Sequence, residues 1–330
     1  METKAKKRGR PPKQQPQVKQ EEQNHAEVLT ALIEAAKKEI PETYEDTKLE
    51  KGVLLIATGH PYYTHLAANL ANAIKYQDPQ LHITLLHDMV GMNQLSPERL
   101  ASFDSIKPLP DHCYNGDPYY PKLCLDLLTP YKRTLYLDVD MICTSRDKTV
   151  NELFSILETT EFTIANRGRI TNTEMFSQWA KLEDIQRTYD IDGIYDVSSE
   201  VVYFEGMPEV FELARQIYDQ RLLEVEKFGA GYPDEFFISI AMEKLQVRPH
   251  ETGWLPSYWM NHYFMKPKPF STVQDNFYFY SIGGARQNDF QRKQYNLLNE
   301  HFHYRMNGTS KSIYRISFDK RKVVKERHSK

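Results

Sequence analysis

The apolar residues change their spacing several times along the chain, and each change marks an expected structural element. The unbroken apolar run at 52–58 lies between Gly52 and a Gly-His-Pro turn at 59–61, which is typical of a strand buried on both faces. Apolar residues at 66–74 then recur at helical spacing, and those at 81–85 alternate as in a second strand. Strand, helix and strand in this order predict the opening of a doubly wound α/β sheet.

The remaining pattern extends this α/β arrangement. It predicts strands at 134–139, 162–166 and 201–204 and helices at 150–157, 209–228 and 234–245. Beyond residue 247 the periodicity gives way to aromatic-rich loops, and the last twenty residues are basic. We therefore expect one folded α/β domain over residues 50–290 and a basic C-terminal extension over 291–330.

The first 49 residues differ from the rest in composition. Residues 1–24 are rich in Lys, Gln, Pro and Glu with almost nothing to bury, which predicts disorder, and a short amphipathic helix is expected around 28–36. The first and last twenty residues each carry a net charge of +6, whereas the whole chain carries −3, which leaves −15 between them. Basic ends on an acidic body favour a polyanionic partner, the alternative being solvated tails.

The chain lacks the sequence features of secreted and membrane proteins. No apolar run approaches the roughly 18 residues of a membrane span, and the basic N-terminus is not followed by the apolar segment of a signal peptide. The three cysteines, Cys113, Cys124 and Cys143, are odd in number and show no paired spacing, which disfavours a disulfide framework or a cysteine zinc site. We expect a cytoplasmic protein with no membrane partner, or a nucleoid or nuclear one if the basic tail binds DNA.

Two carboxylates occur at the end of the strand expected at 134–139. Asp138 and Asp140 are two residues apart, so within a strand they would project to the same side. Open α/β sheets bind ligands beyond the carboxyl ends of their strands, and two acids there need a positive partner. A divalent cation, Mg²⁺ or Mn²⁺, fits such oxygen ligands and would neutralise a departing diphosphate. The alternative is a solvated pair of acids in a loop.

The segment around these acids resembles a known family. Residues 120–140 read Tyr120-Pro-Lys122-Leu-Cys-Leu-Asp-Leu-Leu-Thr-Pro-Tyr131-Lys-Arg-Thr-Leu-Tyr-Leu-Asp138-Val-Asp140. This is similar to the glycogenin and lipopolysaccharide-galactosyltransferase family, which carries a Lys-Leu pair, a helix and then Tyr-Leu-Asp-x-Asp. The resemblance extends over about 53–243. It implies the GT-A fold, which is a Rossmann-like nucleotide-sugar-binding α/β fold, a nucleotide-sugar donor (a UDP-sugar above all), a divalent cation, and transfer with retention of configuration.

The resemblance also implies site residues. It assigns Asp138 and Asp140 to the metal, and it makes Lys122 and Asp234 the catalytic candidates because Asp234 matches an acid near the reacting carbon. Ser198 and its neighbour stand where the family has Asn-Ser-Gly. The implied nucleotide-sugar contacts are Thr58, Tyr62, Lys122, Asp138, Ser198, Ser199 and Glu235.

Two departures from the family affect the metal and the sugar. The family's third metal ligand is the His of a His-x-x-Gly segment, whereas this chain has Tyr280-Ser281-Ile-Gly283-Gly284. Either Ser281 or Tyr280 leaves that position to water, or His301 or His303 supplies the ligand. The family's closing Lys-Pro-Trp is also missing, so the identity of the donor sugar does not carry over.

A second motif lies in the basic tail. Lys6-Lys7-Arg8-Gly9-Arg10-Pro11-Pro12-Lys13 resembles an AT-hook, whose Gly-Arg-Pro core lies in the narrow minor groove of A·T-rich DNA. Narrow grooves attract Arg, flanking Lys residues neutralise phosphates, and Pro keeps the backbone extended. The resemblance assigns DNA binding to Lys7, Arg8, Gly9, Arg10 and Pro11. A generic basic tail is the alternative.

Three functional hypotheses follow from these motifs. The chain is a metal-dependent glycosyltransferase that acts on an acceptor held on DNA, for example a hydroxylated base, with the tail as a tether. Alternatively, it is a cytosolic glycosyltransferase whose acceptor is a glycan, a protein or a small molecule. The third hypothesis is a DNA-binding protein with a non-catalytic GT-A domain, which the intact Lys122, Asp138, Asp140 and Asp234 disfavour.

Overall fold

The computed structural model describes residues 48–330 apart from 115, 145–147, 173–178, 207, 226–230, 251–256, 260–277, 283–291, 294, 301–311, 317–322 and 328–330. The chain divides into two compact units, Met1–Tyr44 and Glu45–Lys330. All described residues belong to the second unit. The AT-hook-like tail, His301 and His303 lie outside the described residues.

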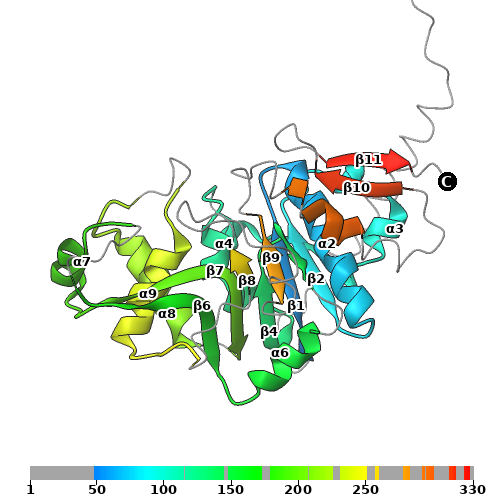
Figure 1. Cartoon of the computed structure of the whole chain (residues 1–330). Helices are drawn as coiled ribbons and strands as arrows, with labels where there is room; N and C mark the ends of the chain where they lie inside the picture. Colours follow the sequence, from blue (N-terminus) through cyan, green and yellow to red (C-terminus); the bar gives the residue numbers. More distant parts are fainter. Residues whose placement is uncertain are drawn as a thin grey trace, which may run out of the picture. The chain divides into compact units, whose positions relative to one another are not determined.

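A six-stranded sheet in the order β3-β2-β1-β4-β7-β6 forms the centre of the second unit (Figure 1). Strands β3, β2, β1 and β4 run parallel, whereas β7 is antiparallel to both of its neighbours. The sheet strands are β1 (Leu49–Ala57), β2 (Ile83–His87), β3 (Ser105–Pro108), β4 (Tyr131–Leu137), β6 (Phe162–Ile170) and β7 (Ile194–Glu205). The predicted α/β fold class is therefore confirmed, with one reversed strand that the pattern did not predict.

Helices cover both faces of this sheet. On one face, α2 (Pro61–Gln77) and α6 (Val150–Ile156) pack against the side chains of Leu55, Leu135 and Val201. On the other face, α7 (Leu182–Tyr189), α8 (Glu209–Gln220) and α9 (Asp234–Lys244) enclose a second core. Figure 1 shows α2 beside β1 and β2, and α8 and α9 beside β6 and β7. No helix among the described residues is long and apolar enough to cross a membrane.

Short elements connect the sheet to the site described below. They are α3 (Pro97–Leu100), α4 (Tyr120–Leu123), α5 (Leu125–Leu128) and the 3₁₀ turns Met92–Gln94 and Asp111–Cys113. A buried ion pair anchors α4 and α5 on α8. The two terminal nitrogens of the Arg215 guanidinium donate to the carboxylate of Asp126, at 2.5 and 2.9 Å, and one of them also donates to the Leu123 carbonyl at 2.7 Å. This bidentate pair is of the strong, geometrically specific kind and fixes the segment that carries Lys122.

Two smaller sheets complete the described structure. Strand β9 (Phe279–Ser281) pairs antiparallel with β5 (Met141–Cys143) and parallel with β8 (Ser257–Trp259). Near the C-terminus, β10 (Ser312–Ile316) pairs antiparallel with β11 (Val323–Arg327). The sequence pattern predicted loops beyond residue 247, so these strands are a correction. They are three to five residues long, which is too short for a period-2 pattern to stand out.

Two predicted boundaries were wrong for identifiable reasons. The helix predicted over 209–228 ends at Gln220, because Arg221 takes a left-handed backbone conformation with φ of 47°. Apolar residues continue the helical spacing beyond that point, but Leu222 is 55% exposed. The strand predicted at 134–139 ends at Leu137, so Asp138 and Asp140 follow the strand rather than lie in it. Their proximity therefore does not come from the alternation of side chains along a strand.

Candidate active site

The two acids of the Asp-x-Asp motif lie in the turn between β4 and β5. The backbone N–H of Asp138 donates to the carbonyl of Glu200 on β7 at 2.8 Å, and the carbonyl of Asp140 accepts from Ile282 at 3.1 Å, just beyond β9. The turn is therefore fixed between the central sheet and the small β5-β9-β8 sheet. Both acids lie beyond the carboxyl end of β4, which is the edge where open α/β sheets bind ligands.

Lys122 meets Asp138 in a close ion pair. Its ammonium lies 2.7 Å from one carboxylate oxygen and 2.9 Å from the other, and it also donates to the Ser199 hydroxyl at 3.1 Å. Burial works to lower the pKa of Lys122, but Asp138 and, to a lesser degree, Tyr136, Asp234 and Glu235 hold it well above its usual value. Lys122 therefore stays an ammonium at physiological pH and is a permanent positive charge beside the acids.

Tyr136 fixes the other side of Asp138. It lies two residues earlier on β4, and its buried hydroxyl donates to the Asp138 carboxylate at 2.6 Å. The Lys122 ammonium lies 5.7 Å from the centre of the Tyr136 ring. Burial, and then the charge of Asp138, raise the pKa of Tyr136 well above its usual value, so its hydroxyl stays protonated and remains a donor. The orientation of Asp138 is thus set by two side chains.

Asp234 and Glu235 begin helix α9 close to this ion pair. Both side chains are buried, with 0% and 5% of their surface exposed, and both contribute to the raised pKa of Lys122. Acids in the first turn of a helix are stabilised by its free N–H groups and its dipole. The loop before α9 is fixed on Asp117, whose carboxylate accepts from the Tyr232 amide at 3.1 Å.

That anchor depends on a glycine. Gly231 has φ of +126°, and a β-carbon at this position would lie 2.5 Å from an Asp117 carboxylate oxygen. Asp117 also accepts from the Tyr119 amide at 2.9 Å and from the Tyr218 hydroxyl at 3.1 Å. One carboxylate therefore joins the start of α9, which carries Asp234, to the start of α4, which carries Lys122. Segments more than a hundred residues apart are held in one arrangement.

A bulge in β7 places the Ser198-Ser199-Glu200 segment at the same edge of the sheet. Ile164 on β6 pairs with Val202, but the next residue of β6 pairs with Ser198. The three residues of β7 between Ser198 and Val202 therefore have no paired residue on β6 and form the bulge. Bulges of this kind redirect side chains and are common beside active sites. Ser199 accepts from Lys122, whereas the Ser198 hydroxyl is 4% exposed and has no hydrogen-bond partner among the described residues. A buried hydroxyl without a partner costs about 1–3 kcal/mol, which is tolerated where a ligand supplies the bond.

Glu200 is joined to the Asp-x-Asp turn through its backbone carbonyl, which accepts from the Asp138 amide at 2.8 Å. It is 6% exposed, and one of its oxygens accepts from the Ser281 hydroxyl of β9 at 2.8 Å. Burial raises the pKa of Glu200 well above its usual value, and the charges of Asp140 and then Asp138 raise it further. The sequence pattern did not identify Glu200 as a site residue. Two features of the sequence could have identified it. Glu200 directly follows the two serines, and Ser281 stands where the family has its metal-binding His.

The predicted nucleotide contacts lie at the ends of the neighbouring strands. Thr58 follows β1 and is half-buried, whereas Tyr62 is 1% exposed within the core on the α2 face. The side chain of Asp88, just after β2, accepts from the Gly59 amide at 2.6 Å and from the Val90 amide at 3.0 Å. Asp88 thus holds the loop after β1 and is a polar residue at this edge that the sequence pattern missed. The nucleotide roles of Thr58 and Tyr62 stay predictions.

The structure therefore brings most of the predicted site together. Lys122, Asp138 and Ser199 are in direct contact, and Asp234 and Glu235 act on Lys122 electrostatically. The carboxylates of Asp138, Asp140 and Glu200 are hard oxygen donors of the type that Mg²⁺ and Mn²⁺ prefer, so the residue chemistry fits a divalent cation. Among the described residues, however, no three His, Cys, Asp or Glu side chains lie close enough together to hold a metal ion. Asp138 is instead engaged by Lys122.

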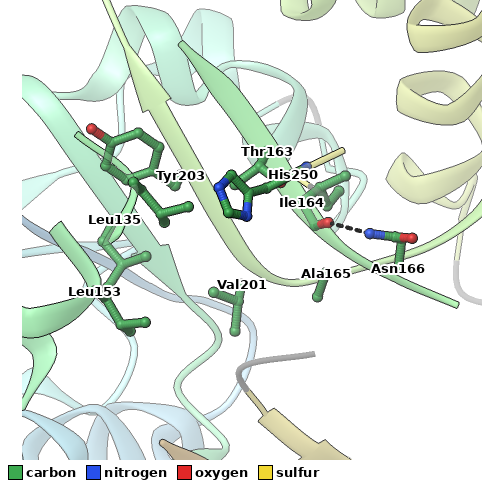
Figure 2. A pocket seen from close by; sticks show the side chains of 10 residues that line it. Leu135, Leu153, Thr163, Ile164, Ala165, Asn166, Val201, Tyr203 and His250 are labelled. Atoms are coloured by element: carbon green, nitrogen blue, oxygen red, sulfur yellow. Dashed lines mark hydrogen bonds between the residues drawn. The ribbon is translucent and has the colours of Figure 1, made fainter. Parts of the chain in front are cut away.

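A small cavity lies apart from this cluster, under the β4-β7-β6 part of the sheet (Figure 2). It has a volume of about 20 Å³, which is room for about one water molecule. Figure 2 shows Leu135, Val201 and the ring of His250 around it, and the Asn166 amide donates to the Ile164 carbonyl at 3.2 Å. None of the acids described above lines it, so it has no part in the candidate site.

Comparison with solved structures finds similarity to several glycosyltransferases. The bifunctional glycosyltransferase WbbM matches with a TM-score of 0.53 and 13% identity, over 81% of this chain and 52% of WbbM. This chain thus spans about half the length of WbbM. The galactosyltransferase LgtC, solved with donor and acceptor sugar analogs, matches with a TM-score of 0.48 and 14% identity, over 78% of this chain and 96% of LgtC.

A third match is the glycosyltransferase GlyE of Streptococcus pneumoniae TIGR4, with a TM-score of 0.49 and 11% identity, over 79% of this chain and 63% of GlyE. No protein-family model and no curated protein matches the chain. At 13% identity the likeness to WbbM shows the fold alone, and the predicted GT-A fold class is confirmed by it.

Proposed function

We propose that this protein is a glycosyltransferase that moves a sugar from a nucleotide-sugar donor, with a divalent cation held by Asp138 and Asp140. The observation that carries the proposal is the contact of Lys122 with Asp138 and Ser199 at the carboxyl end of β4. The Lys122 ammonium, two acids and a buried hydroxyl lie together at the edge of the sheet, which is where α/β folds bind nucleotides. The fold shared with WbbM supports the same reading.

Each residue of the cluster has a distinct task in such a transfer. The Lys122 ammonium lies where it would bind the diphosphate of the donor and stabilise its growing negative charge. A bound Mg²⁺ or Mn²⁺ would supply further charge neutralisation to the leaving group. Ser198 and Ser199 would bind hydroxyl groups of the sugar, since the Ser198 hydroxyl is buried and has no partner within the described part of the chain. Retention of configuration is part of the proposal on the ground of family resemblance.

Asp234 is proposed to act beside the reacting carbon. Asp234→Asn keeps the size of the side chain and removes its charge, so we expect kcat to fall about 10²-fold while donor KM changes little, because an interaction made in the transition state is lost. The measurement is nucleotide release from a panel of nucleotide sugars. Asp184→Asn, at an exposed acid of α7, is the matched control and should keep wild-type rates. Unchanged kcat in Asp234→Asn would remove it from the chemistry.

We propose an acceptor on DNA, for example a hydroxylated base, because an AT-hook-like motif precedes the catalytic unit on an otherwise acidic chain. A tether raises the local concentration of acceptor without altering the active site. The protein would then act in the cytoplasm, in a nucleoid or in a nucleus. An acceptor on a glycan, a protein or a small molecule predicts no turnover that depends on DNA.

Deleting residues 1–20 tests the tether. We expect the truncated protein to keep donor hydrolysis, to lose its preference for A·T-rich duplexes in a gel-shift assay, and to show a higher KM for DNA with nearly unchanged kcat. Binding by the full chain should fall steeply with salt, because basic side chains displace counterions from phosphates. Arg10→Ala should reproduce most of the loss. Equal, salt-insensitive binding by both proteins would leave the tail without this role.

A further inference from the structure

Two of the three cysteines meet in the core that α8 and α9 enclose. Cys113 ends a 3₁₀ turn, and Cys124 lies between α4 and α5. Their side chains are 0% and 1% exposed, neither is in a disulfide, and the Cys124 thiol is hydrogen-bonded to Cys113. Cys143 lies in the core on the other face of the sheet. The spacing of the cysteines along the sequence did not predict this pair.

The two thiols differ in acidity. The hydrogen bond from Cys124 lowers the pKa of Cys113, and the Arg215 guanidinium lowers it further, against the opposite effects of burial and of Asp126. Donating this bond raises the pKa of Cys124, and burial adds to the rise. The thiolate is the form of cysteine that attacks an oxidant, so Cys113 is the more reactive member of the pair. Cys124 is placed to react next, because its thiol already points at the Cys113 sulfur.

The segment between the two cysteines organises the candidate active site. Asp117 joins the start of α4 to the start of α9 through the two amides that it binds. Lys122 lies two residues before Cys124 and contacts Asp138 at 2.7 Å. A covalent bond between Cys113 and Cys124 would therefore close a loop that contains both the anchor of α9 and the ammonium of the site.

We propose that Cys113 and Cys124 form a reversible disulfide when the protein meets a peroxide, and that this bond clamps the segment that carries Lys122. The Cys113 thiolate attacks hydrogen peroxide, which gives a sulfenic acid and releases hydroxide, and the hydroxide takes up the proton that the thiol had lost. The Cys124 thiol then attacks the sulfenic sulfur, the S–S bond forms, and the sulfenic oxygen leaves as water. Two thiols and one hydrogen peroxide thus yield one disulfide and two water molecules.

The surroundings of the pair favour a small oxidant. Both thiols are buried, and α4 is in contact with α8, so a bulky disulfide reagent would have to separate these helices. The loop that follows Cys113 is exposed at Gly116 and Pro118. Exposed loops open locally at low cost in free energy, and hydrogen peroxide is close to water in size. Hydrogen peroxide is therefore the oxidant to use in a test.

Counting thiols in the folded protein tests the bond without reference to activity. The reduced full chain is treated with hydrogen peroxide, the oxidant is removed, and the free thiols are titrated in denaturant. We expect the count to fall from three to one and to return to three with dithiothreitol. Mass spectrometry of peptides should show Cys113 joined to Cys124.

Single substitutions provide the controls for this count. Cys143→Ser removes the cysteine of the other core and should still form the bond. Cys113→Ser should form no intramolecular disulfide, because it lacks the attacking thiolate. If Cys113→Ser does not fold, Cys124→Ala serves instead, since it removes the second thiol and fills the site with a small apolar side chain.

The effect of the bond on activity rests on the proposed function. The sulfur atoms of a disulfide are about 2.05 Å apart, which is closer than two hydrogen-bonded thiols, so α4 must shift as the bond forms. Lys122 would then leave its present position beside Asp138, and a displacement of about 1 Å at an active site can cost about 10²-fold in rate. We expect peroxide to reduce nucleotide release by the wild type roughly 10-fold or more, with recovery in dithiothreitol. Cys113→Ser should keep its own rate under both conditions.

The outcomes separate this inference from the proposed function. Three free thiols after peroxide treatment, or a disulfide that includes Cys143, overturns the bond between Cys113 and Cys124. A bond between them that leaves nucleotide release unchanged overturns the clamp on Lys122. If the reduced protein releases no nucleotide from any nucleotide sugar, the proposed function fails, and the thiol count still decides whether the bond forms.

Discussion

Asp140→Asn is expected to reduce nucleotide release from the preferred nucleotide sugar by about 10²–10³-fold, which is the usual loss when one preorganised electrostatic contact is removed. The substitution keeps the size and the backbone contact of Asp140, whose carbonyl accepts from Ile282. It removes one of the two charges that the cation needs. The dependence of the rate on Mn²⁺ concentration should therefore shift to higher concentration, with the maximal rate also reduced.

A folding defect is easily told apart from this effect. Asp140 raises the pKa of the buried Glu200 carboxyl, so its neutral replacement relieves repulsion, and the metal-free variant should be as stable as the wild type. Urea unfolding without metal checks this expectation. Donor hydrolysis that survives both EDTA in the wild type and the Asp140→Asn substitution would show that no cation at this turn takes part.

Lys122→Ala is expected to have two effects, one on catalysis and one on stability. Without the ammonium, the departing diphosphate loses a fixed positive charge, and kcat should fall about 10²–10³-fold. The free energy of unfolding should also fall by about 3 kcal/mol, because the largely buried Asp138 is left without its partner, and breaking such a pair is costly. Both side chains of the pair are less than a quarter exposed, so solvent screens the loss only in part.

A double variant separates the two effects. Lys122→Ala combined with Asp138→Asn removes both charges, so stability in urea should return towards the wild-type value while activity stays lost. Lys122→Arg keeps the charge in a different shape and should retain more activity than Lys122→Ala. If Lys122→Ala keeps the wild-type kcat, the ammonium has only the structural role of neutralising Asp138.

The sequence by itself determined the α/β class and the edge of the sheet where chemistry occurs. The apolar runs that became β1 and β4 are buried on both faces, and hydrophobicity alone identifies such runs. The acids directly after β4 had to lie at its carboxyl end wherever the strand was placed. The resemblance then selected Lys122, and the structure brought it into contact with Asp138.

Tertiary structure decided which distant residues join these acids. A period-2 pattern gives the faces of a strand but not its direction or its partners, so the antiparallel β7 and its bulge were not predictable from it. That bulge brings Glu200 to the Asp-x-Asp turn, and β9 brings Ser281 from more than 130 residues further along the chain. Neither residue can be found from an apolar pattern, because both are polar residues that are buried and contact each other. The contact of Ser281 with Glu200 beside this turn therefore becomes visible only when the strands are paired.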